Sequence, residues 1–247
     1  DHRDLHSFPT RRSSDLFTQI ITMLPLYVLG CLILGVCIAP AIYMYQLITE
    51  TFSSSIHVLN LFVMGCAFAA SFFTYGFTLL FVAPIMNIIL RCNLKPWRGS
   101  YYSAETLKWF VHNALTYLAR FTFLEFVTPT PMSNLFFQMM GMKIGKGTVI
   151  NTTYISDPSL ISLGERVTLG GSVTIVGHYG QGGLLIIAPV VIGDNCTIGL
   201  KSSIMGGVTI GNNAKILPHS VVMPKTHILD GEVWGGVPAR KLDPKDL

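Results

Sequence analysis

The chain has 247 residues, of which half are hydrophobic and only 12% are charged, with a formal net charge of +4. Soluble domains have about a quarter of charged residues, so this composition predicts that part of the chain sits in lipid. The small charge, without a basic stretch interleaved with aromatic residues, argues against binding to nucleic acid. The five cysteines show neither a C-x-x-C pair nor a metal-ligand spacing, so we expect reduced packing residues. The length allows one or two domains.

The first residues read as an artefact rather than as protein. The string HSFPTRRSSDL, residues 6–16, is similar to the in-frame translation of a common sequencing-library adapter. Such segments are excluded from reasoning about the fold. We therefore expect residues 1–16 to be adapter-derived and the natural start to be missing; the alternative is a genuine polar tail.

Two long runs without charge follow, over residues 16–49 and 51–90. Each exceeds the roughly 20 residues that a helix needs to cross the ~30 Å hydrocarbon layer, and membrane helices tolerate the prolines in these runs. The alternative is a pair of buried core helices. Uncharged runs of this length favour a transmembrane hairpin over residues 17–98.

Positive charges lie on one side of this hairpin. The connection over residues 50–55 has none, whereas four follow the second run: Arg91, Lys95, Arg98 and Lys108. The positive-inside rule then places everything after Arg91 in the cytoplasm. Trp97, Tyr101 and Tyr102 suit the aromatic belt at the interface.

Residues 99–141 form a predicted helical connector. Its apolar side chains share one face of a helix that starts after a possible Ser103 cap: Leu107, Phe110, Val111, Ala114, Leu115, Leu118 and Phe121. Its polar side chains share the other face: Lys108, His112, Asn113 and Thr116. This helix either packs on the end of the following domain or lies on the membrane surface, and the sequence leaves both readings open. A shorter apolar helix follows, up to Met140.

From residue 192 onward an aliphatic residue recurs at every sixth position: Ile192, Ile198, Ile204, Ile210, Ile216, Val222 and Ile228. A period of six suits neither a helix nor a flat strand. It is the hexapeptide signature of a parallel β-helix. We therefore predict a mainly β domain over residues 142–247, a left-handed parallel β-helix with three flat sides. Each aliphatic residue should stack on its counterpart three hexads later.

The same phase extends upstream, from Ile144 to Ile175, with two interruptions. The corner near Asp157 has one extra residue, and the seventeen-residue gap from 175 to 192 predicts a protruding loop over residues 177–183. His178 lies on this loop. Because imidazole titrates near neutrality, it can take a proton from a hydroxyl or amine that attacks a thioester. The alternative is a surface histidine on a flexible loop.

Three stretches carry a family resemblance: DPSLISLGERVTLGGSVTIVGH, VVIGDNCTIGLKSSIMGGVTIGNNAKILPHSVV and GGVPARKL. Residues 141–242 resemble the hexapeptide-repeat acyltransferases, also called the isoleucine-patch family. This resemblance implies a homotrimer that binds acyl-CoA, such as acetyl-CoA, in the groove between neighbouring prisms. His178 falls on the position of the family's general base. Asp157 and Glu165 match acidic positions, and either would orient the imidazole.

The resemblance also implies contacts with the donor in the later coils. These cofactor-binding candidates are Gly199, Ser202, Gly206, Gly207 and Lys225. Glycine lets a pantetheine arm approach the backbone, and the lysine would meet a phosphate. The alternative for each is structural, because corners require glycine and exposed faces accept lysine.

Some hexapeptide prisms are carbonic anhydrases with a zinc ion on three histidines. Here His178, His219 and His227 include no close pair, so we expect no metal.

A second resemblance, in architecture, is to one membrane-bound C-terminal unit of the polylysine-synthetase-type nonribosomal peptide synthetases. It rests on two spans, a connector and a prism that ends in a turn over residues 234–239. It implies a phosphopantetheine-bound thioester delivered by a carrier protein.

The sequence thus predicts a membrane-anchored acyltransferase of a bacterial inner membrane, with its β-helix in the cytoplasm. The acceptor is a small or lipid-linked hydroxyl or amine whose identity the repeats do not fix. Two other readings stay open: the synthetase unit, and a non-catalytic trimeric scaffold in contact with membrane lipid.

Overall fold

The computed structural model describes residues 13–101 and 103–243, with side chains from residue 24 onward. Most of the adapter-like segment and Tyr102 therefore lie outside the described residues. The chain forms two compact units, Asp1–Tyr75 and Gly76–Leu247, which are described separately.

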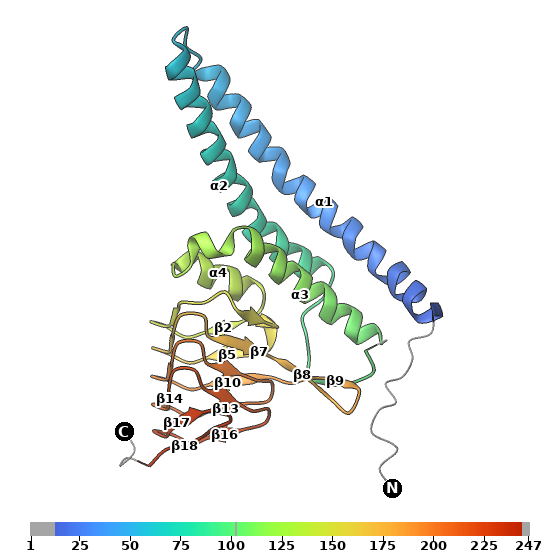
Figure 1. Cartoon of the computed structure of the whole chain (residues 1–247), viewed down its shortest axis with the longest axis vertical. Coiled ribbons are helices and arrows are strands. Elements are labelled where there is room, and N and C mark those ends of the chain that lie inside the picture. The colour runs from blue at the N-terminus through green and yellow to red at the C-terminus, as the bar shows by residue number, and fades with distance from the viewer. Residues whose placement is uncertain (1–12, 102, 244–247) are drawn as a thin grey trace. The chain divides into compact units, whose positions relative to one another are not determined.

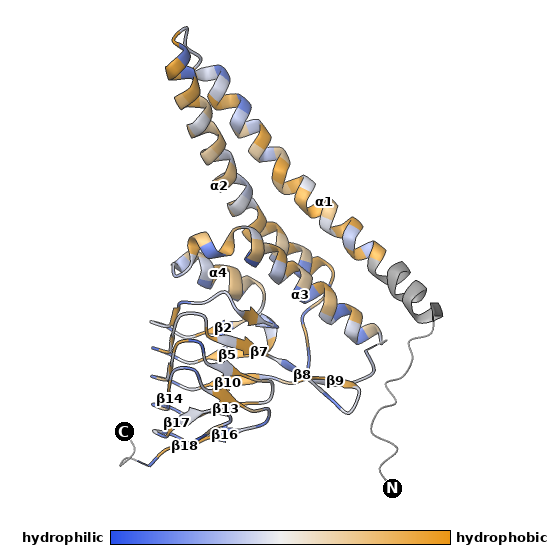
Figure 2. Ribbon diagram, viewed as in Figure 1, coloured by the Kyte–Doolittle hydropathy of each residue, from blue (hydrophilic) through white to orange (hydrophobic). Residues whose placement is uncertain are grey.

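Two long helices account for the first third of the chain. They are α1 (Ser13–Thr51) and α2 (His57–Ile89), and α2 continues from the first unit into the second. By length and composition, Leu24–Thr51 and His57–Ile89 are apolar enough to cross a membrane. Figure 2 shows how apolar residues dominate both helices. In the connecting turn, the Ser54 amide donates to Asn60 Oδ1 at 2.7 Å.

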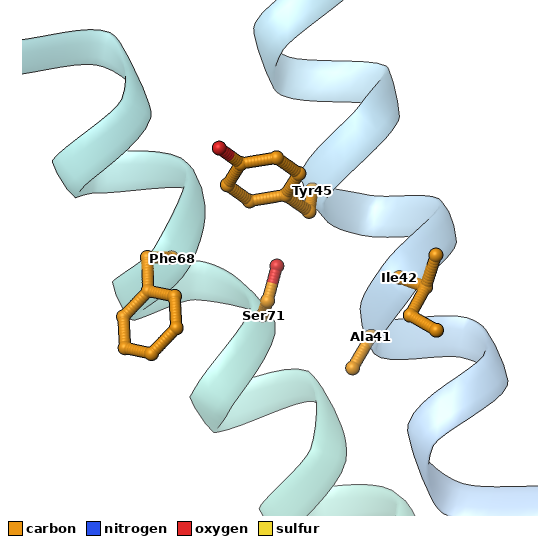
Figure 3. A pocket seen from close by; sticks show the side chains of 5 residues that line it. All are labelled: Ala41, Ile42, Tyr45, Phe68 and Ser71. Carbon is orange, nitrogen blue, oxygen red and sulfur yellow. The ribbon is translucent and has the colours of Figure 1, made fainter. Parts of the chain in front are cut away.

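Within the first unit, α1 and α2 leave a small hollow between them (Figure 3). It has a volume of about 300 Å³ and is lined by Ala41, Ile42, Tyr45, Phe68 and Ser71. None of these five side chains carries a charge, so this hollow is not a candidate for proton transfer.

The second unit contains the predicted β-helix, in which short parallel strands stack to form three faces (Figure 1). Face one contains β2 (Lys143–Ile144), β5 (Ile161–Leu163), β10 (Val190–Ile192), β13 (Thr209–Ile210) and β16 (His227–Ile228). Face two contains β3 (Val149–Ile150), β6 (Thr168–Leu169), β11 (Thr197–Ile198), β14 (Lys215–Ile216), β17 (Val233–Gly236) and β18 (Ala239–Lys241). Face three contains β4 (Ile155–Ser156), β7 (Thr174–Val176), β12 (Ser203–Ile204) and β15 (Val221–Val222).

The register of the strands confirms the predicted stacking. Ile192 pairs with Ile210, and Ile210 pairs with Ile228, each three hexads apart. All three side chains are at most 3% exposed, so a column of aliphatic carbon fills the prism. After the last full coil, β17 turns back into β18 as an antiparallel pair.

The segment predicted as a loop is a β-hairpin. It does leave the coil, but as β8 (His178–Gln181) and β9 (Leu184–Ile187), joined at Gly182 and Gly183. Both glycines have positive φ, the backbone region that glycine adopts without strain. The second strand, β9, is central in this sheet and also pairs with β1 (Trp97–Gly99), and Leu185 and Ile187 are buried there. His178 is therefore held on an anchored sheet rather than on a free loop.

The connector contains α3 (Ala104–Thr122), η1 (Leu124–Val127) and α4 (Pro131–Met139). The Ser103 cap is confirmed, because its Oγ accepts a hydrogen bond from the Thr106 amide at 3.2 Å. In α3 the polar face is turned inward: His112, Asn113 and Thr116 are buried. On the apolar face, Leu107 is 48% exposed and Phe121 is 74% exposed. Burial in α3 therefore does not follow the amphipathic pattern as a whole, because Leu115 of the apolar face is buried and Lys108 of the polar face is exposed.

Candidate active site

His178 and Asp157 form a close pair at the corner between faces three and one. The imidazole Nδ1 lies 2.5 Å from Asp157 Oδ2, and the Gly177 amide donates to the same oxygen at 3.0 Å. Asp157 is fully buried, whereas the His178 side chain is 23% exposed. Because a carboxylate only accepts, the shared proton sits on Nδ1, and Nε2 keeps its lone pair for a substrate.

Two local features create this pair. Asp157 occupies the corner with the extra residue and has a left-handed backbone, with φ of +59°. The short helix η2 (Pro158–Leu160) follows it. A Cβ at Gly206, one coil further on, would lie 3.0 Å from the His178 amide nitrogen, so a side chain there would obstruct the start of β8. The irregular corner and the inserted hairpin therefore converge on one spot.

Helix α3 adds two residues that the sequence reasoning did not single out for chemistry. The Trp109 ring meets the His178 imidazole edge to face, with ring centroids 4.9 Å apart. Asn113 Nδ2 donates to Asp157 Oδ1 at 2.6 Å. The two residues are four apart on one helix, a spacing that brings both to one face. That spacing, on a polar face, was the only signal in the sequence.

Glu165, the other acidic candidate, lies at a different corner of the prism. It sits between β5 and β6, where its carboxylate is 3.5 Å from Arg166. The structure thus brings Asp157, and not Glu165, to His178.

The predicted donor contacts divide between two corners. Gly206, Gly207 and Lys225 lie between faces three and one, on the edge of the prism that also has His178. Lys225 Nζ stands 6.0 Å from the ring centroid of Tyr179. Gly199 and Ser202 lie between faces two and three. Ser202 is fully buried and its Oγ donates to the Leu217 carbonyl at 2.9 Å, which is a structural contact.

The histidines weighed as zinc ligands are also separated. His219 lies between β14 and β15, while His227 Nδ1 bonds Thr209 Oγ1 at 2.5 Å on face one. Within residues 13–101 and 103–243, no group of three histidine, cysteine or acidic side chains is close enough to hold a metal ion.

His112 lies directly beside Asn113 and is fully buried in a polar network. Its Nδ1 lies 2.8 Å from Asn87 Oδ1, and its Nε2 lies 3.4 Å from Ser159 Oγ. Burial lowers the pKa of His112 to about 4, against a smaller opposing effect of the Asp157 charge. His112 is therefore neutral at physiological pH.

We expect this burial to make the protein less stable in mild acid. Between pH 6.5 and 4, His112 binds a proton in the unfolded chain but stays neutral in the folded chain. The free energy of unfolding therefore falls as the pH is lowered. The pKa difference corresponds to roughly 3 kcal/mol. Tm measured against pH should fall more gently in His112→Gln than in the unchanged protein. His57→Gln, at an exposed position, is the matched control. An unchanged pH dependence in His112→Gln would contradict a neutral His112.

Part of the chain is similar to known proteins. Residues 189–224 match the family model described as "Bacterial transferase hexapeptide (six repeats)". "Putative acetyltransferase YvoF" of Bacillus subtilis is 30% identical over 148 residues, which cover 56% of this chain and 85% of that protein. "Delta-poly-L-ornithine synthetase" of Acinetobacter baumannii is 26% identical over 117 residues, or 47% of this chain. The match spans only 9% of the length of that synthetase.

Among solved structures, a hexapeptide-repeat acetyltransferase from Vibrio cholerae, crystallised with acetyl coenzyme A, is similar with a TM-score of 0.45. It is 18% identical, and the match covers 62% of this chain and 96% of that one.

Proposed function

Because this chain belongs to the bacterial hexapeptide transferase family, we propose that it moves an acyl group from a thioester to a hydroxyl or amine. The observation that supports this proposal is the 2.5 Å contact between His178 and a buried Asp157. His178 begins the β8–β9 hairpin, and Asp157 lies at a corner of the prism. A carboxylate on Nδ1 orients an imidazole so that Nε2 acts as a general base.

The reaction then follows from the position of the lone pair. His178 Nε2 takes the proton of the acceptor as its oxygen or nitrogen attacks the thioester carbonyl carbon. The new bond forms, the negative charge on the carbonyl oxygen is stabilised by backbone N–H groups, and the C–S bond breaks. The departing thiolate receives the proton from the imidazolium. Asp157 stays ionised throughout and stabilises the charged ring.

For the donor we propose acyl-CoA, with acetyl-CoA as the first choice. Gly207 is half-buried and Lys225 is exposed on the edge next to His178, where the lysine could meet a phosphate. The name of the Bacillus relative also suggests an acetyl group. We further propose a homotrimer, in which a neighbouring prism closes this edge into a groove.

A second candidate donor is a thioester carried on phosphopantetheine by a carrier protein. The observation that favours it is the match to part of a poly-ornithine synthetase. In that case the chain is the C-terminal unit of a larger synthetase, and the acceptor is an amine. The non-catalytic scaffold is a third reading, which a tightly paired His178 and Asp157 disfavours.

One experiment separates these donors. The full-length chain in lipid nanodiscs is given acetyl-CoA and, separately, an acyl-loaded carrier protein, with a mixture of amine and hydroxyl acceptors. Thiol release is measured for each donor. Release from acetyl-CoA supports the first proposal, and release from the carrier alone supports the second. Release from neither, with any of a broad set of acceptors, supports the scaffold.

We also propose that helices α1 and α2 anchor the protein in a membrane, with the β-helix on the cytoplasmic side. The two apolar helices support this, and so does the outward apolar face of α3, which suits the boundary between lipid and water. The transfer site would then lie about one helix diameter, roughly 10 Å, from lipid.

A spin label on α3 tests this placement. In a background with Cys31 and Cys66 replaced by serine, we expect a label at Phe121→Cys to be relaxed by oxygen rather than by a water-soluble nickel reagent. A label at His227→Cys, which is exposed on face one, should be relaxed by the nickel reagent rather than by oxygen. Equal access of the nickel reagent to both labels would contradict a membrane-facing α3.

A further inference from the structure

We infer that Asn113 of α3 is a positioning residue for the His178–Asp157 pair, so that the connector helix completes the transfer site from outside the β-helix. The inference rests on the proposed function, because it assigns Asn113 a role in the same proton transfer. It identifies a part of the site that the hexapeptide repeats do not contain.

The Asn113 side chain forms hydrogen bonds with both the carboxylate and the backbone amide of Asp157. Nδ2 donates to Asp157 Oδ1 at 2.6 Å and to the Trp109 carbonyl at 3.1 Å. Oδ1 accepts from the Asp157 amide at 3.3 Å. Both amide hydrogens and the amide oxygen are thus in use. A flipped amide would point its NH2 group at the Asp157 N–H, so only one orientation satisfies this site.

The two carboxylate oxygens of Asp157 have different hydrogen-bond partners. Oδ1 faces Asn113, which leaves Oδ2 to the Gly177 amide and His178 Nδ1. Asp157 is fully buried, and a buried carboxylate requires donors on both oxygens. Without Asn113, Oδ1 would lose the donor that α3 supplies, and the carboxylate could turn about its Cβ–Cγ bond. The imidazole would then lose its fixed direction, while its chemistry stayed intact.

Asn113 also bonds the backbone at the same corner. Asp157 adopts φ of +59°, a left-handed conformation that other corners of the prism share, for example at Arg166 and Lys201. The hydrogen bond from the Asp157 amide to Asn113 Oδ1 stabilises that conformation. One side chain on α3 therefore sets both where Asp157 lies and which oxygen it presents to His178.

The same helix offers a matched control one turn away. Tyr117 OH bonds Ser156 Oγ at 2.8 Å, and so joins α3 to the residue before Asp157. This bond does not involve the carboxylate. Tyr117→Phe removes a hydrogen bond of similar length between the same two elements, without touching Asp157. If Asn113 merely fastened α3 to the coil, the two substitutions would have the same consequences.

The test uses the full-length chain in nanodiscs, with whichever thioester donor proves active. In Asn113→Ala we expect kcat to fall by roughly tenfold to a hundredfold, the scale of a misplaced catalytic group, with the KM for the donor unchanged. Tyr117→Phe should stay within about twofold of the unchanged protein. The isosteric Asn113→Asp keeps the volume but faces Asp157 with an acceptor, so its loss should be at least as large.

A spectroscopic readout reports the position of the ring directly. With ¹⁵N-labelled histidine, the unchanged protein should show His178 protonated at Nδ1, and Asn113→Ala should show a mixture of tautomers. His178→Ala identifies the resonance and sets the zero of the activity assay. If His178→Ala loses activity while both Asn113 variants keep full turnover and a single His178 tautomer, this inference alone is overturned. Full activity in His178→Ala overturns the proposed function as well.

Discussion

We expect His178→Ala to lower kcat for acyl transfer by roughly 10²–10⁴-fold, the usual contribution of a general base. Nδ1 of this residue is committed to Asp157, which leaves Nε2 of the neutral ring as the base in the proposed transfer. The fold should tolerate the change. The His178 side chain is 23% exposed, and Asp157 retains its hydrogen bonds from Gly177 and Asn113. Turnover and Tm measured on the same sample check both statements.

His227→Ala is the matched control for this substitution. His227 is exposed on face one, where its ring bonds Thr209. It should retain activity and oligomeric state. Full activity in His178→Ala would end the proposal that this corner performs general-base catalysis. Lost activity together with a lowered Tm would assign the effect to folding instead.

A large effect on stability is expected at Gly199, where consecutive coils almost touch. A Cβ there would lie 2.7 Å from the Leu217 carbonyl carbon and 2.8 Å from Pro218 Cα, both backbone atoms of the next coil. Neither can move without parting the parallel strands. We expect Gly199→Ala to destabilise the protein by about 3 kcal/mol through overpacking. For a chain of this size that lowers Tm by roughly 6–12 °C.

Gly171→Ala is the control for this prediction. A Cβ at Gly171 would meet only Asn151 Nδ2, at 3.8 Å, which is ordinary van der Waals contact. Both variants restrict the unfolded chain equally, so the difference in Tm between them isolates the clash between coils. Equal melting temperatures would mean that the coils stand further apart than the structure shows.

The β-helix was predictable because its signal is local and repeated. A hexad places Ile198 inward whatever its neighbours are, and β11 and β14 pair Ile198 with Ile216 as the period requires. His178 was also within reach, since an insertion into a strict period draws attention to itself. The choice between Asp157 and Glu165 was not, because both lie upstream at corners and only the folded coil shows which corner meets His178.

Pairings between distant segments left no trace in the sequence. β1 adds to β9 through residues 97–99 and 185–187, an antiparallel contact to which no period points. The direction of α3 was equally hidden. An amphipathic pattern identifies two faces, but the face with His112 and Asn113 turns inward only because Asn87, Asp157 and Ser159 supply partners for it. Those partners come from two other segments of the chain, α2 and the corner with η2.

The inward-facing polar residues of α3 have a consequence for the order of events during synthesis. Asn113 leaves the ribosome 44 residues before Asp157, and His112 leaves it 47 residues before Ser159. At about 5–20 residues per second, the helix waits roughly 2–9 seconds for these partners. During that interval its polar residues remain hydrated. With the membrane anchoring proposed above, the nascent chain would hold α3 at the bilayer surface until the first coils of the prism are built onto it.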